Sequence, residues 1–191
     1  YIPPAENAEI SWFRWANDNR LVLSYAFTAE RYGLKTRETR LYGVDRDGKN
    51  LKNLIKPRRK KGSMGRLSVE EVATQIQDAV IDWLPNDPDH ILVSVDGDRD
   101  GRDEVRVVDV NDGGFKEIIS GNRGIQNYRT DQQGEVRLGW GVNELNERKN
   151  MFKSPLINDW RSIEKTSWGD QGFDIIDFTE DPKIVYAVGL N

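Results

Sequence analysis

The chain has 191 residues, of which 32 are Asp or Glu and 28 are Lys or Arg, and its formal net charge is -4. This near balance argues against nucleic acid as the main partner, because nucleic-acid binders carry a concentrated basic surface. The chain has no Cys and a single histidine, His90, which excludes disulfides, thiolate nucleophiles and most Cys- or His-ligated metal sites. No run of about 18 apolar residues occurs, so we expect no membrane span. A chain without Cys suits the periplasm and the cytoplasm equally, and its location stays open.

Four segments share one order of features: an aromatic residue, an acidic or amide-rich turn, and a strand of alternating apolar residues. They are residues 15–25 (WANDNRLVLSY), 83–95 (WLPNDPDHILVSV), 128–140 (YRTDQQGEVRLGW) and 178–188 (FTEDPKIVYAV). From Ile91 to Val136 and on to Ile184 the steps are 45 and 48 residues. A four-stranded propeller blade has a period of about 40 to 50 residues. The repeat therefore predicts consecutive propeller blades.

A second hairpin follows the first in two of these repeats. Residues 39–44 lead through an Asp-Gly turn to 51–55, and residues 105–110 lead through another to 115–119. Asp-Gly turns adopt positive φ at low cost and match the twist of antiparallel strands. The sequence thus predicts an all-β fold, a single partial β-propeller domain over residues 1–191 with about three and a half four-stranded antiparallel blades. The blades are expected at 10–56, 79–120, 125–166 and, incomplete, 173–191.

Between the first two repeats the step is 70 residues, from Leu21 to Ile91, so an insertion is required. We expect a longer loop at 28–37 and a linker between blades at 57–78. A capping-box pattern begins at Ser68 and apolar residues recur on one helical face after it, which predicts a short helix in the linker. The basic run at its start (RRKK) is interpreted as a solvated loop, because the rest of the chain is acidic.

About three and a half blades do not close a ring, and an open propeller exposes strand edges that act as pairing templates. We therefore expect the chain to be a segment of a larger propeller, or to self-associate through its open blade edges.

Three stretches resemble the amino-terminal propeller of the prolyl oligopeptidase family of serine peptidases, most of all its bacterial dipeptidyl aminopeptidase and acylaminoacyl peptidase types. They are residues 15–24 (WANDNRLVLS), 82–94 (DWLPNDPDHILVS) and 131–139 (DQQGEVRLG). The resemblance extends from Ile10 to Leu190, and the Asp-Pro-Asp-His phrase is its most distinctive part. It implies a parent enzyme in which the propeller filters peptide substrates by size and docks against an α/β-hydrolase domain.

The catalytic signature of that family is missing from this sequence. Its Ser nucleophile should lie in Gly-x-Ser-x-Gly, and none of the nine Ser residues has Gly at both required positions. His90 has no recognisable partner for acid or base chemistry. We expect no catalytic residue here, and a role in gating and docking. A periplasmic propeller scaffold for a protein partner and a calcium-dependent interaction module are the alternatives.

The acidic stretch DGDRDGRDE resembles the front half of a calcium loop, with oxygen ligands at alternate positions and a Gly at the sharp turn. An EF-hand is excluded, because its twelfth position is Val107 instead of Glu. A variant site remains, formed by Asp96, Asp98, Asp100 and Glu104. A solvated turn is the simpler interpretation, because two arginines within the stretch offset part of its charge.

Six Trp residues are candidates either for a sugar- or peptide-binding surface or for the core. Trp15 and Trp83 occupy equivalent positions of the repeat, so we expect them to pack between neighbouring blades. Trp160 and Trp168 fall outside that pattern and are weaker core candidates.

Overall fold

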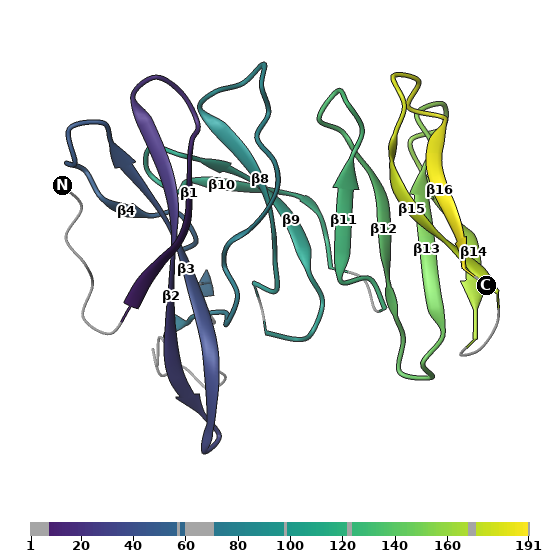
Figure 1. Ribbon diagram of the computed structural model, residues 1–191, viewed down its shortest axis with the longest axis horizontal. Helices are drawn as coiled ribbons and strands as arrows, with labels where there is room; N and C mark the ends of the chain where they lie inside the picture. The colour runs from purple at the N-terminus through teal and green to yellow at the C-terminus, as the bar shows by residue number, and fades with distance from the viewer. Residues whose placement is uncertain are drawn as a thin grey trace. The chain divides into compact units, whose positions relative to one another are not determined.

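The computed structural model describes residues 8–56, 58–59, 71–97, 99–121, 124–167 and 171–190. Within these ranges every regular element is a β-strand, and no helix is present that could span a membrane. The strands form three four-stranded sheets and two two-stranded sheets, all antiparallel (Figure 1). The chain therefore has the partial, propeller-like all-β fold that the sequence predicts, without a closed barrel in its described part.

The strands of each four-stranded sheet follow one another in chain order. Sheet 1 consists of β1 (Ala8–Trp15), β2 (Arg20–Arg31), β3 (Leu34–Asp45) and β4 (Lys52–Asn53). Sheet 2 consists of β7 (Ala79–Asp82), β8 (His90–Val95), β9 (Glu104–Asp109) and β10 (Phe115–Ile119). Sheet 3 consists of β11 (Asn127–Thr130), β12 (Val136–Val142), β13 (Arg148–Lys153) and β14 (Trp160–Thr166). Sheet 4 has only β15 (Gly172–Phe178) and β16 (Val185–Leu190), and a small ladder joins β5 (Arg58–Arg59) to β6 (Glu71–Val72).

One local hydrogen bond explains why the acidic or amide residue recurs in the repeat. In all four sheets the turn from the first strand to the second begins with a side-chain oxygen that accepts a hydrogen bond from the backbone N–H two residues later. These residues are Asn17, Asp82, Asp131 and Thr179. Such turns are a local preference of Asn, Asp, Ser and Thr, so the sequence pattern fixes where each first hairpin turns.

The loop predicted at 28–37 is wrong, because β2 and β3 continue as a regular ladder as far as the pair Arg31 and Leu34. They turn on Tyr32 and Gly33, whose φ angles are 53° and 76°. Two successive residues with positive φ make the turn type that matches strand twist. The insertion therefore lengthens a hairpin, which extends beyond the rest of sheet 1 (Figure 1).

The predicted linker helix lies partly outside the described residues. In its described portion the prediction is wrong, since Glu71 and Val72 form β6 and residues 73–78 are not helical. Backbone groups that a helix would need are bonded to β3 instead. The carbonyl of Gln75 accepts the N–H of Thr39 at 2.9 Å, and the Thr39 hydroxyl accepts the N–H of Gln77 at 2.9 Å.

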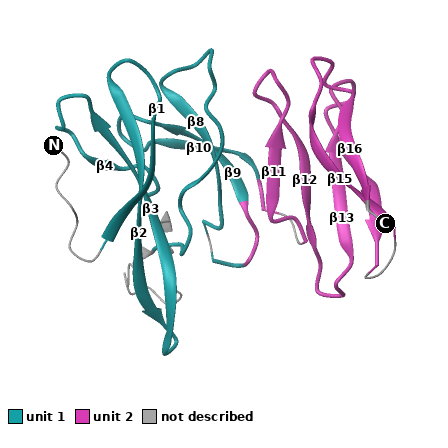
Figure 2. Cartoon of the chain, viewed as in Figure 1, with its two compact units in different colours: residues 1–100, 104–119 teal, residues 101–103, 120–191 magenta. Residues whose placement is uncertain are grey.

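The chain divides into two compact units (Figure 2). Unit 1 comprises residues 1–100 and 104–119 and contains sheets 1 and 2, whereas unit 2 comprises residues 101–103 and 120–191 and contains sheets 3 and 4. The single domain expected from the sequence stays a prediction.

In unit 1, sheets 1 and 2 pack against each other through one aliphatic cluster. Its buried members are Val22, Leu41, Leu54, Ile55, Ile91, Val93, Val95, Val108 and Val110. Trp12 and Trp83 pack against this cluster with their ring centroids 6.1 Å apart, so Trp83 lies between sheets as expected. The prediction for Trp15 is wrong, because Trp12 and Trp15 are three residues apart in a strand and face opposite sides, so Trp12 packs against the cluster and Trp15 is 51% exposed.

In unit 2, one core cluster consists of the buried residues Leu138, Phe152 and Phe178, with Trp140, Ile175 and Val185 packed against it. The ring of Trp160 packs edge-on against Tyr128, with the centroids 6.5 Å apart. Trp168 lies outside the described residues.

Candidate functional site

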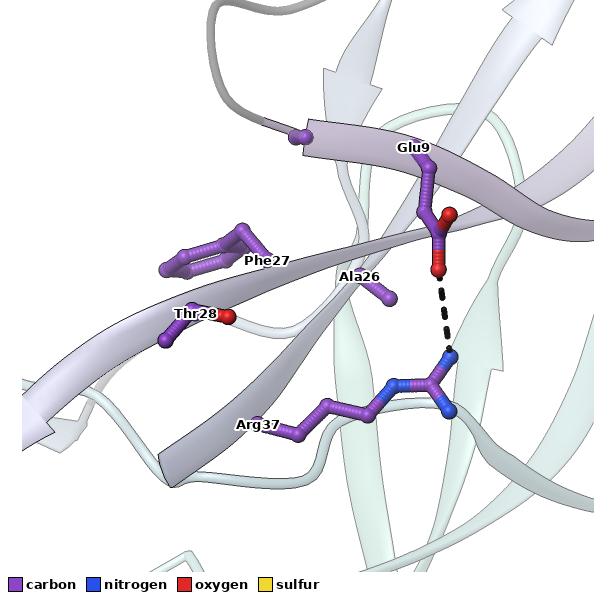
Figure 3. A pocket seen from close by; sticks show the side chains of 6 residues that line it. Glu9, Ala26, Phe27, Thr28 and Arg37 are labelled. Carbon is purple, nitrogen blue, oxygen red and sulfur yellow. Dashed lines mark ion pairs between the residues drawn. The ribbon is translucent and has the colours of Figure 1, made fainter. Parts of the chain in front are cut away.

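A shallow hollow of about 500 Å³ lies on sheet 1, where β1, β2 and β3 run side by side (Figure 3). Its lining residues are Ala8, Glu9, Ala26, Phe27, Thr28 and Arg37. The guanidinium of Arg37 lies 4.0 Å from the carboxylate of Glu9 and donates a hydrogen bond to the hydroxyl of Ser11 at 3.0 Å. Both charged side chains are mostly exposed, at 62% and 78%, so solvent weakens the ion pair.

This lining suits binding better than catalysis. It offers one cation, one anion and the aromatic ring of Phe27, which can contact an extended polar chain such as a peptide. Its hydroxyl group, on Thr28, has no histidine beside it in the lining to act as a base.

A buried carboxylate lies between two guanidinium groups next to the hollow. Glu38 is 3% exposed and forms ion pairs with Arg31 and with Arg40, the latter at 2.7 Å. The hydrogen bond from Arg31, together with Arg40, outweighs burial and lowers the pKa of Glu38. Arg40 also lies over the ring of Phe27, 5.0 Å from its centroid. Arg31 also donates a hydrogen bond to the backbone carbonyl of Ala73 at 3.3 Å. The cluster therefore fastens the segment after β6 to sheet 1.

Local contacts shape the acidic loop before β9. The carboxylate of Asp96 accepts the N–H of Asp100 at 3.0 Å, and Asp98 lies outside the described residues. Glu104 is 5% exposed and forms an ion pair with Arg106. Across the described ranges, no group of three or more metal-ligating side chains is positioned to hold a metal ion. Calcium binding by this loop stays a prediction, and Glu104, one of its four proposed ligands, is turned toward an arginine.

His90 closes the turn that leads into β8. The ring Nδ1 of His90 lies 2.9 Å from a carboxylate oxygen of Asp87. The backbone N–H of His90 donates a hydrogen bond to the backbone carbonyl of Asp87 at 3.1 Å. The hydrogen bond that the ring of His90 donates to the Asp87 carboxylate raises the pKa of His90, and burial opposes this only in part. No hydroxyl in the described part of the chain is bonded to the ring, so the pair has the geometry of a turn and not of a nucleophile with its base.

Two polar residues that the sequence analysis missed, one buried and one partly buried, join sheets 1 and 2. Arg20 is 1% exposed, and it donates to the carbonyls of Val110 and Asn111 at 2.7 and 3.0 Å and to the carboxylate of Asp45 at 2.7 Å. The sequence signal for it is a charged residue at the very start of an apolar strand.

Asp78 is the second link, and it precedes β7 of sheet 2. Its carboxylate accepts hydrogen bonds from Trp12, Ser24 and Thr39 at 3.1, 2.7 and 2.7 Å. These donors lie on β1, β2 and β3, so a single carboxylate fastens the entry of sheet 2 to three strands of sheet 1.

Comparison of this chain with protein-family models, with curated proteins and with solved structures found no match. The resemblance to the prolyl oligopeptidase family therefore stays a prediction from the sequence.

Proposed function

We propose that this chain is a non-catalytic propeller segment of a prolyl-oligopeptidase-like serine peptidase, in which it gates substrate access and docks the hydrolase domain. The observation that carries the proposal is the threefold repetition of a four-stranded antiparallel meander, each opened by the same side-chain-capped turn, on phrases that resemble that family. Blades of this kind form a rigid wall that admits or excludes a peptide by its size.

The side-chain chemistry of the described residues supports a passive role. Their histidine, His90, is bonded to Asp87, and their largest polar clusters serve to join strands and sheets. Arg20 and Asp78 tie sheets 1 and 2 together from within, which gives the stiffness that a size filter needs. The hollow beside Phe27 provides an open surface for passing peptide chains.

Labelling, cleavage and binding measurements on the purified 191-residue chain test the proposal. A serine-directed fluorophosphonate should not label it, and aminoacyl and dipeptidyl chromogenic substrates should not be cleaved. Added to a propeller-free hydrolase domain of a prolyl oligopeptidase, the chain should bind it. Cleavage of long peptides by that domain should then fall several-fold, while cleavage of a dipeptide substrate stays unchanged, because only long chains are excluded by size.

Labelling of the chain by the fluorophosphonate would contradict a non-catalytic role. If the chain neither binds the hydrolase domain nor changes the length dependence of cleavage, the link to peptidases is wrong, and a scaffold for another protein partner becomes the better explanation. A heat-unfolded sample of the same chain serves as the control for nonspecific inhibition.

A further inference from the structure

The hairpin of β2 and β3 is longer than its counterparts in sheets 2 and 3. Its two strands have 12 residues each, whereas the second and third strands of sheets 2 and 3 have six or seven. The last four residue pairs, from Thr28 with Arg37 to Arg31 with Leu34, lie past the described end of β1. We call residues 28–37 the finger, which projects beyond the rest of sheet 1 (Figure 1). Since sheets 2 and 3 form without such a projection, a four-stranded sheet of this repeat does not require it.

Tyr32, at the tip of the finger, has a backbone conformation that is unfavourable for its residue type. Its φ is 53°, which Gly, Asn and Asp adopt at lower cost than Tyr. The ring is 92% exposed, and the hydrogen bond to its hydroxyl comes from Arg99, itself exposed, at 3.5 Å. Leu34 beside it is 69% exposed. An exposed aromatic residue that costs backbone energy and packs so little within the chain indicates a contact outside it.

The base of the finger is held in place by buried charges. Glu38 follows the finger directly, is 3% exposed, and forms ion pairs with Arg31 and Arg40. These two guanidinium groups also donate hydrogen bonds to the backbone carbonyls of Ala73 and Thr74, at 3.3 and 3.2 Å. Because the base is fixed before any partner binds, the tip loses little conformational entropy on binding.

The shape and charge of the finger restrict what binds its tip. A projecting hairpin is complementary to a concave surface, which a flexible peptide does not offer. A second copy of this chain offers the hollow beside Phe27, but that hollow is shallow and is lined by the base of the finger itself. An anionic lipid surface would be repelled by Asp96 and Asp100 in the loop that carries Arg99. The tip therefore fits best into a cleft of a different folded domain.

We propose that Tyr32 and Leu34 enter a cleft of the hydrolase domain and anchor the chain to that domain. The choice of the hydrolase domain as the partner rests on the proposed function. Tyr is among the residues that most often dominate the energy of a protein interface. Its ring buries a large apolar area with few rotatable bonds, and its hydroxyl still forms a hydrogen bond when the ring is buried.

The variant Tyr32→Asn tests the proposal without harming the fold, because Asn adopts the φ of position 32 more readily than Tyr. It should unfold at the same or a higher urea concentration than the wild-type chain. Calorimetric titration into the propeller-free hydrolase domain should give a dissociation constant about thirtyfold higher than for the wild-type chain. Leu145→Asn is the matched control, because Leu145 is 78% exposed on the turn between β12 and β13, and it should leave the dissociation constant unchanged.

The possible results separate this proposal from the proposed function. If the wild-type chain binds the hydrolase domain and Tyr32→Asn binds it equally well, the finger is not the anchor, while the docking role stands. If the wild-type chain does not bind the domain, both are wrong. Sedimentation velocity and flotation with phosphatidylserine vesicles test the other partners. A dimer or a vesicle complex that forms with the wild-type chain and is lost in Tyr32→Asn would assign the tip to a second copy or to a membrane, and would overturn the proposal.

Discussion

The two units of the chain hold their sheets together by different means. In unit 1, sheets 1 and 2 share a cluster of nine buried aliphatic residues and are also joined by Arg20 and Asp78. In unit 2, one cluster of three buried residues lies between sheets 3 and 4, and Ile125, Tyr128 and Val136 are buried as well. Its ion pair between these sheets, Arg148 with Asp174, lies at the surface, with exposures of 26% and 55%.

This difference separates two ways of fixing a sheet against its neighbour. Aliphatic packing is strong but not directional, whereas a buried guanidinium with several fixed acceptors specifies one relative position of two sheets, because any slip leaves polar groups unsatisfied. Unit 1 uses both. Unit 2 joins its sheets through the aromatic contact of Phe152 with Phe178, whose ring centroids are 6.5 Å apart, and through hydrogen bonds such as that from the N–H of Phe173 to Glu164 at 2.9 Å, without a buried guanidinium among its described residues. We therefore expect unit 1 to respond most to the loss of a polar side chain and unit 2 to the loss of an aromatic one.

The largest effect is expected for Arg20→Met, which keeps most of the buried volume but removes every hydrogen bond of the guanidinium. It leaves the carbonyls of Val110 and Asn111 and the carboxylate of Asp45 without this donor, so the free energy of unfolding should fall by about 4 kcal/mol. Urea unfolding measures the loss. Hydrogen exchange followed by mass spectrometry should locate it in β2 and β9.

Arg46→Met is the matched control, because Arg46 is exposed on the turn after β3 and a surface substitution usually changes stability by less than about 0.5 kcal/mol. Equal losses for the two variants, or faster exchange in β12 and β13 than in β2 and β9, would show that Arg20 does not join the sheets of unit 1.

Phe178→Ala should have the next largest effect, with a loss of about 3 kcal/mol, because the ring is 1% exposed and its removal leaves a cavity between sheets 3 and 4. Exchange should accelerate in β12, β13 and β15, the strands that carry the rest of this core. Ile176→Ala removes an apolar side chain of the same strand that is 53% exposed, and it should cost less than about 1 kcal/mol. The comparison of the two units fails if Phe178→Ala instead accelerates exchange mainly in β2 and β9.

The parts of the fold that the sequence predicts are those set by short-range rules. Turn caps such as Asn17 and Asp131 act on a backbone N–H two residues away, so the repeat locates the first hairpins without any tertiary information. The Asp-Gly turn at Gly48, with a φ of 81°, belongs to the same class. Alternation of apolar residues then identifies the strands, because one face of each is buried.

The errors arise where distant contacts outweigh a local preference. The capping pattern at Ser68 favours a helix, but in the described portion the backbone of Gln75 and Gln77 bonds to Thr39, more than thirty residues earlier. The turn at Tyr32 and Gly33 was missed because Tyr is an unusual residue for a position of positive φ. Neither outcome follows from periodicity.

The polar residues that join the sheets are the hardest to predict. Arg20 meets the carbonyl of Val110, ninety residues later, and a Cβ on Gly43 would come within 2.4 Å of that same oxygen, so this glycine is required by a contact that no local pattern reveals. The pairing of Glu104 with Arg106 was within reach, because residues two apart in a strand point to the same face. This spacing favours an ion pair of Glu104 with Arg106 over a role of Glu104 as a calcium ligand.

The smallest effect on stability is expected for the partly exposed pair of His90 and Asp87 in unit 1. Its hydrogen bond raises the pKa of His90 in the folded chain above the ordinary value of 6.5. The added stability is fully present below pH 6.5 and is lost as the pH rises through the folded pKa. Because the ring is 37% exposed, solvent screening keeps this contribution below about 1 kcal/mol.

His90 is the single histidine of the chain, so its ring protons give an unambiguous NMR titration. Asp87→Asn should lower its pKa toward 6.5 and flatten the dependence of stability on pH above 6.5. Asp89→Asn should shift the titration much less, because Asp89 acts only through its charge and is the weakest of the contributors that raise this pKa. Equal shifts in the two variants would mean that general acidity of the loop, and not the hydrogen bond that closes the turn, sets the protonation of His90. In that case the partly exposed pair of His90 and Asp87 would not act through a directional hydrogen bond, as the buried Arg20 does.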